Sequence, residues 1–181
     1  MVTIRHSHST EYNPGETTAW LSSLGLPDSK ISSLLETEHW LQQHGFTEAT
    51  CPQVRTGWEM VEILADLRMD KDALTSALLF PLIEAGILSC EELDNLFPPA
   101  VLTMLAAVKQ MEAIRTIPVG PGQTPNPQQA DNLRKMLLTM VEDVRAVVIK
   151  LAAQICYLRD VKNADEETRV LAAKQTNAIF A

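Results

Sequence analysis

The chain has 181 residues, 46% of them hydrophobic, and a formal net charge of −8. This length suits one domain with its own core, without help from metals or disulfides. The acidic balance argues against a general nucleic-acid binder or a protein that binds anionic membranes.

The first third of the chain predicts a flexible arm over residues 1–15 and the start of one helical domain over 16–181. Helical spacing begins near Trp20 and ends at Gly25. Asp28 is predicted to cap a second helix, which Gly45 closes because glycine readily adopts the left-handed conformation after a helix. A third helix is expected from about Gly57, with an apolar stripe of Met60, Ile63, Leu64 and Leu67.

The middle of the chain predicts a buried central helix. Asp70 is a natural N-cap for the run 73–85, which is apolar almost all round and should therefore lie in the core. Pro81 inside this run predicts a kink or a helix end, since proline costs about 3 kcal/mol in a regular helix. A short helix is expected from Ser89 to the prolines at 98 and 99.

A longer helix is predicted over 101–114, followed by a loop over 116–127 with four prolines and two glycines. Two apolar stripes come next, which either form two helices that Asp143 separates or belong to one long bent helix. Their members are Leu133, Met136, Leu137, Met140 and Val141, then Val144, Val147, Val148, Leu151, Ile155 and Leu158. A last helix from Asp165 reaches Phe180 without a stop signal, so we expect the chain to be cut from a longer protein.

No segment shows the alternation of a strand, so the sequence predicts an all-α fold of seven to ten helices. No signal peptide and no run of about 20 apolar residues is present, which favours a soluble, cytoplasmic protein without membrane contact.

Residues that could bind metal or carry catalysis are sparse. The three cysteines are odd in number and lack CxxC spacing, so neither a zinc ribbon nor a disulfide framework is indicated. Cys156 lies in an apolar run and should behave as a small hydrophobe. The four histidines, His6, His8, His39 and His44, lack the spacing that places two imidazoles on one helix face. Glu84 ends the buried run, and we expect the helix to reach the surface there.

Four segments, 57–70, 77–86, 143–159 and 170–174, together resemble the HD-type hydrolase domain of the RelA/SpoT family. Members of this family make and destroy the alarmone (p)ppGpp. The resemblance covers nearly the whole chain, implies a compact HD-like helical bundle, and is strongest to the ribosome-associated synthetase members.

The resemblance also implies which positions would hold the manganese ion of a hydrolytic member. The first histidine falls on Thr56, the His-Asp pair on Phe80 and Pro81, and the acidic pair on Glu84 and Ala85. The later metal aspartate falls on Ala153, and a neighbouring His-Asn pair on Cys156 and Tyr157. Except for Glu84, these side chains offer a hard divalent ion neither imidazole nor carboxylate. We therefore expect no metal, no cofactor and no hydrolysis, and we expect Phe80, Pro81, Ala85, Ala153 and Tyr157 to fill the former cleft.

Three functions follow as hypotheses. The first is a catalytically inactive regulatory or scaffolding domain, whose partners would be the synthetase domain of the same chain and, through missing C-terminal regions, the ribosome. The second is a hydrolase with a metal site rebuilt from Glu84, Glu142, Asp143 and an N-terminal histidine. The third is a free-standing adaptor that binds a protein or a nucleotide in the degenerate cleft.

Overall fold

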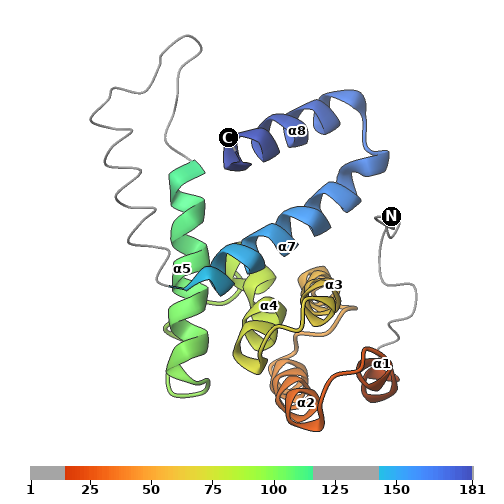
Figure 1. Ribbon diagram of the computed structural model, residues 1–181, viewed down its shortest axis with the longest axis vertical. Helices are drawn as coiled ribbons and strands as arrows, with labels where there is room; N and C mark the ends of the chain where they lie inside the picture. Colours follow the sequence, from red (N-terminus) through yellow and green to blue (C-terminus); the bar gives the residue numbers. More distant parts are fainter. Residues whose placement is uncertain (1–14, 116–142, 181) are drawn as a thin grey trace.

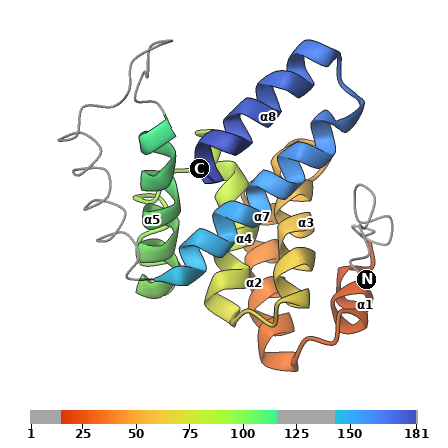
Figure 2. The ribbon, with the colours of Figure 1, turned by 45° about the horizontal axis from the view of Figure 1, so that its top comes forward.

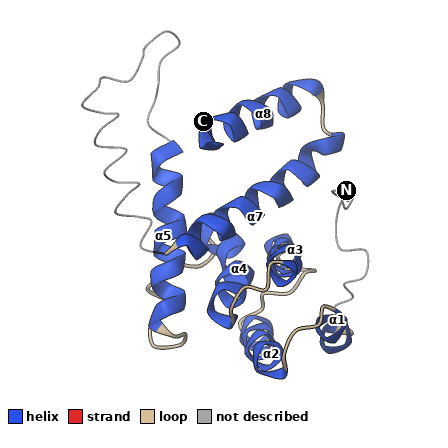
Figure 3. Cartoon of the chain, viewed as in Figure 1, coloured by secondary structure: helices blue, strands red, loops and turns tan. Residues whose placement is uncertain are grey.

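The computed structural model describes residues 15–115 and 143–180, and within them every element is helical, which confirms the predicted all-α fold (Figures 1 and 3). These residues form seven α-helices and one 3-10 helix. Their bounds are α1 Thr17–Ser23, α2 Asp28–Gln43, α3 Pro52–Asp66, α4 Lys71–Glu84, α5 Pro99–Arg115, α7 Val144–Asp160, η1 Val161–Asn163 and α8 Glu166–Phe180.

The first two helices end as predicted but begin differently. Gly25 and Gly45 follow α1 and α2 with φ of +69° and +81°, the left-handed conformation that glycine adopts without strain. Asp28 does not cap α2, because Pro27 occupies the N-cap and Asp28 is the first helical residue. There its carboxylate still lies at the positive end of the helix dipole.

The third helix begins at Pro52, five residues earlier than predicted. Proline suits the first turn of a helix because the missing N–H has no partner there in any case, so Pro52 marks the start of α3. Met60 and Leu64 of the predicted stripe are buried and Ile63 is half-buried, but Leu67 lies at the helix end and is 58% exposed.

Helix α4 is the centre of the bundle, and it packs against α2, α3, α5 and α7 (Figure 2). Every residue from Ala73 to Ile83 is buried, and Asp70 Oδ1 accepts the Ala73 N–H at 2.9 Å, both as predicted. Of the two alternatives expected at Pro81, a kink or a helix end, the helix end was wrong, because α4 continues to Glu84. Proline here removes one hydrogen bond from the last turn, a loss that the burial of apolar neighbours can offset.

Residues 89–97 form successive turns instead of the expected short helix. Ser89 and Glu92 make the reciprocal bonds of a capping box, with Ser89 N–H donating to Glu92 Oε2 at 2.7 Å and Glu92 N–H to Ser89 Oγ at 3.3 Å. Asn95, however, has φ of +64°, which interrupts right-handed helix three residues later.

In the C-terminal part, Asp143 caps α7 and Asp165 caps α8, as predicted. Most of the apolar stripe predicted for α7 does not face the core, although Val148 packs against the edge of the core. Ala146, Ile149, Ala152 and Cys156 are buried instead, while Val144, Ile155 and Leu158 of the stripe are exposed. Apart from Ile149 these buried residues are small, and small residues allow close packing of α7 against α3 and α4, which both contact it.

The predicted arm over 1–15, the loop over 116–127 and the stripe from Leu133 to Val141 lie outside the described residues, apart from Gly15. Among the described helices, none is long and apolar enough to cross a bilayer.

Candidate functional site

The positions that the resemblance assigns to a metal site lie on α3, α4 and α7, three helices that pack pairwise against one another (Figure 2). Thr56 lies on α3, Phe80, Pro81 and Glu84 on α4, and Ala153 on α7. Cys156 and Tyr157 follow on α7, and Ala85 caps the end of α4.

Apolar residues fill only the inner part of this region. Phe80 is completely buried, Pro81, Ala153 and Cys156 are buried, and Thr56 is half-buried. The expectation that Ala85 and Tyr157 also fill the cleft was wrong, because both are exposed. Ala85 lies beyond the last turn of α4, and Tyr157 follows the buried Cys156 by one residue, which rotates it about 100° around the helix.

A lysine that the sequence analysis did not single out lies between α4 and α7. Lys150 Nζ donates to Glu84 Oε1 at 2.8 Å and lies 5.2 Å from the centroid of the Phe80 ring. The lysine is buried, whereas Glu84 is partly exposed at the helix end, as expected. A positive charge therefore lies beside two of the degenerate positions. The sequence did offer a signal for this ion pair, since Lys150 stands inside the apolar run of α7. A lysine buried in such a run requires an acidic partner.

Two further polar side chains are buried nearby. Glu59, on α3 three residues after Thr56, is buried and lies 3.9 Å from Arg55 Nε. Gln154, adjacent to Ala153, donates from Nε2 to Thr176 Oγ1 of α8 at 2.8 Å. The surroundings of the degenerate positions are thus part hydrocarbon and part paired polar groups.

Cys156 is held as a neutral thiol. Burial and the negative charge of Glu59 raise the pKa of Cys156 to about 12. A thiol binds metal ions and attacks electrophiles as the thiolate, so this cysteine is a poor ligand and a poor nucleophile at neutral pH. The structure agrees with the prediction that Cys156 acts as a small hydrophobe.

The residues at this site do not fit a divalent metal ion. Across residues 15–115 and 143–180, no three His, Cys, Asp or Glu side chains gather in a ligand set. His39 and His44 lie at the C-terminal end of α2, where His39 contacts Gln43 and His44 bonds the Trp40 carbonyl at 2.8 Å. His6, His8 and Glu142 lie outside the described residues.

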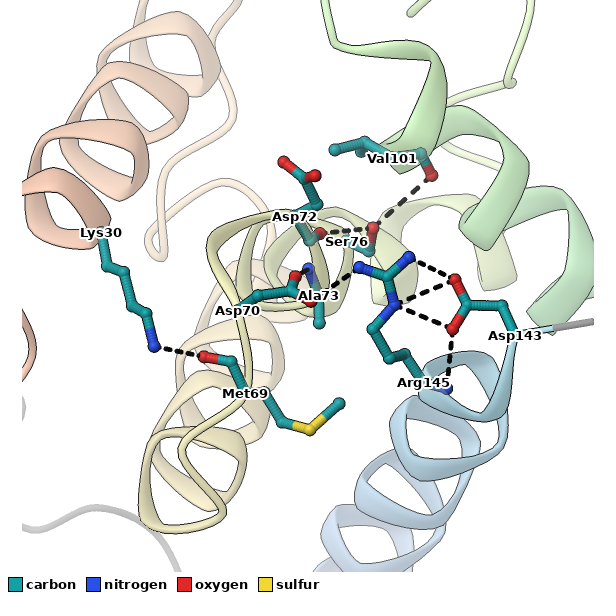
Figure 4. Close-up of polar contacts among 9 residues, drawn as sticks. All are labelled: Lys30, Met69, Asp70, Asp72, Ala73, Ser76, Val101, Asp143 and Arg145. Atoms are coloured by element: carbon teal, nitrogen blue, oxygen red, sulfur yellow. Dashed lines mark hydrogen bonds and ion pairs between the residues drawn. The ribbon is translucent and has the colours of Figure 1, made fainter.

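The second hypothesis required Glu84 and Asp143 to share a rebuilt metal site, but the two carboxylates bind different partners. Asp143 caps the start of α7 and binds Arg145, whose guanidinium also bonds Asp70 Oδ2 at 2.6 Å (Figure 4). Glu84, at the end of α4, pairs instead with Lys150, which lies on α7 about two turns after Asp143. Each carboxylate already neutralises a different cation.

The Asp70–Arg145–Asp143 network ties the N-terminal caps of α4 and α7 together (Figure 4). The Arg145 guanidinium lowers the pKa of Asp143. Burial opposes a lower pKa at Asp70, but hydrogen bonds from Ala73 N–H and Arg145 outweigh it and the pKa falls. Both carboxylates are therefore ionised and accept hydrogen bonds at neutral pH, and these bonds hold the two helix ends together.

A hollow of about 480 Å³ lies between α2, the start of α4 and the segment before α5. Its lining combines hydroxyl groups with Trp40, Phe97 and Lys71. None of the degenerate positions lines it. The adaptor hypothesis places a ligand at the degenerate positions, and this hollow does not provide a binding site at those positions.

Comparison with known proteins identifies the family. Residues 35–181 match the profile of the HD domain. The chain is 42% identical to a GTP pyrophosphokinase of Escherichia coli K12, 39% to one of Photobacterium angustum and 34% to one of Haemophilus influenzae. Each alignment covers all of this chain and 25%, 24% and 25% of the relative, respectively. The chain thus spans about a quarter of the length of these relatives.

Proposed function

Because this chain belongs to the HD domain family, in the RelA/SpoT group of GTP pyrophosphokinases, we propose that it is a pseudo-hydrolase domain that supports or restrains a synthetase. The domain comprises residues 16–181, with residues 1–15 as an N-terminal arm. It binds no metal and hydrolyses no alarmone.

The observation that carries the proposal is the environment of Phe80 and Pro81. A hydrolytic member needs an imidazole and a carboxylate here, and a phenyl ring and a pyrrolidine ring are buried in their place. The ammonium group of Lys150 lies 5.2 Å from the phenyl ring and binds Glu84, the one acidic side chain kept at these positions. A divalent cation would meet repulsion from this charge and would find its remaining ligand already neutralised.

The activity of the whole protein is part of the same proposal. Relatives four times as long are GTP pyrophosphokinases, and we assign the same pyrophosphate transfer from ATP to GTP to a longer polypeptide that contains this chain. The synthetase domain of that polypeptide is then the partner of this one, the ribosome is reached through regions outside it, and the protein works in the cytoplasm.

Two measurements test the loss of hydrolysis. Manganese titration by calorimetry should give no binding heat, and incubation with (p)ppGpp and manganese should release no pyrophosphate, with a hydrolytic family member as the positive control. Turnover that disappears in Glu84→Ala would instead establish a rebuilt active site and refute the proposal.

A further inference from the structure

Helix α7 carries an apolar stripe on the side opposite its buried face. Val144 is 64% exposed, Ile155 is 41% exposed and Leu158 is 37% exposed, while Val148 and Leu151 between them are half-buried. We call these five residues the α7 seam. They follow one another at spacings of four, three, four and three residues, which places them in one line about 21 Å long.

The spacing of the α7 seam is that of a helix that packs against another helix. Apolar residues at alternating three- and four-residue intervals form the contact line of a coiled coil. Packing among the described residues explains only part of the pattern, because Val148 alone of the five packs against the core, whose main contacts with α7 come from Ala146, Ile149, Ala152 and Cys156. Val144, Ile155 and Leu158 stay exposed on the same side of the helix, and exposed apolar residues grouped on one face are typical of a surface that binds another one.

The length of the relatives indicates what covers the α7 seam. The chain aligns along its whole length with about a quarter of the E. coli relative, so three quarters of such a polypeptide lie outside it. We propose that the α7 seam is the docking surface for an amphipathic helix from this remaining part of the same polypeptide. The inference rests on the proposed function, in which the chain is one domain of a longer synthetase.

The surroundings of the α7 seam specify the chemistry of that helix. Arg159 lies one turn after Ile155, beside the line of apolar residues, and carries a positive charge at the C-terminal end of α7. The docking helix should therefore present an apolar line of matching spacing flanked by an acidic residue near this end. Such pairing fixes the orientation of the helix more than its affinity.

Hydroxyl-radical footprinting of the complete polypeptide, read by mass spectrometry, tests the inference. Leu67 is the internal reference, because it is exposed at the end of α3 and outside the α7 seam. After correction for intrinsic reactivity, Ile155 and Leu158 should be labelled several-fold more slowly than Leu67. Labelling at rates comparable to Leu67, or a reading frame that ends at Ala181, would overturn the inference.

Variants of the complete polypeptide identify the occupant. Ile155→Lys should raise the labelling of Leu158 and Leu151 by several-fold, whereas Leu67→Lys should leave both unchanged. Ultracentrifugation is run in parallel, and protection that disappears on dilution to a monomer would show that a second copy covers the seam, which contradicts the proposal. Alarmone hydrolysis by the same preparation would refute the proposed function. The labelling rates of Ile155 and Leu158 would still test the docking surface independently.

Discussion

The ammonium group of Lys150 lies 2.8 Å from Glu84 Oε1, but the lysine side chain is only 7% exposed and the glutamate side chain is 37% exposed. The two partners therefore depend on the ion pair unequally. Water can solvate Glu84 when Lys150 is absent, whereas Lys150 has little access to water when the Glu84 charge is lost.

This asymmetry predicts that Glu84→Gln destabilises the fold more than Lys150→Met does. We expect Glu84→Gln to lower the free energy of unfolding by about 1–2 kcal/mol, because a buried ammonium loses its neutralising charge. Lys150→Met should cost less than about 1 kcal/mol, since methionine keeps the apolar contacts with Phe80. Urea titration followed by circular dichroism measures both. The double variant should be closer to Lys150→Met, and equal losses in the two single variants would contradict the prediction.

Close packing of α3 on α4 gives a second prediction. A Cβ atom built on Gly57 would lie 2.5 Å from the Leu78 carbonyl oxygen, which belongs to helix backbone and cannot rotate away. We therefore expect Gly57→Ala to separate the helices and to lower the unfolding free energy by about 2–3 kcal/mol, despite the better helix propensity of alanine.

Gly25→Ala is the matched control for this close approach. Nothing lies within 4 Å of a Cβ at Gly25, and only its φ of +69° disfavours a side chain. The cost there should be about 1 kcal/mol, since it is the strain of a single left-handed residue. Thermal or urea unfolding ranks the two variants, and a Gly57→Ala protein as stable as the wild type would show that α3 and α4 are not tightly packed.

Local signals predicted the framework of the fold. The run from Ala73 to Ile83 lacks a polar face, and burial on all sides is the physical consequence. Asp70, Asp143 and Asp165 cap the helices that they were expected to begin, because a short carboxylate can accept an exposed N–H of the first turn from its own position.

Non-local packing decided what the sequence could not show. Residues 89–97 contain a capping box, but the backbone turns at Asn95, whose φ is +64°, and the helix that the capping box predicts does not form. On α7, the larger residues of the stripe suggested the core face, and the smaller residues form it because α3 and α4 lie close. The pairing of Lys150 with Glu84 joins residues 66 positions apart, so no local pattern could assign it.

The raised pKa of Cys156 makes a third prediction about thiol reactivity. Burial raises the pKa of this thiol to about 12, so it stays protonated at mildly alkaline pH and should not react with Ellman's reagent in the folded protein. Cys90 is half-buried and should react first. All three cysteines should react at similar rates in denaturant. Reaction of Cys156 as fast as that of Cys90 in the folded state would show that the region around Glu59 and Cys156 is open to solvent.

The arginine network predicts how stability depends on acid. The pKa values of Asp70 and Asp143 lie below their ordinary value of 3.8 in the folded protein. Their stabilising contribution is therefore complete above the unfolded value and is lost as the pH falls through the lower folded values. Arg145→Met should remove about 1 kcal/mol of stability near neutral pH, an amount limited by partial solvent exposure. It should also make the decline in stability below about pH 4 shallower, because the pKa values of the two carboxyl groups return toward their ordinary values.

The control variant Arg169→Met removes the same charge from an exposed position on α8 and should leave the slope unchanged. Urea midpoints measured across the acidic range give both slopes, and identical slopes for Arg145→Met and the wild type would remove this network as a source of acid sensitivity.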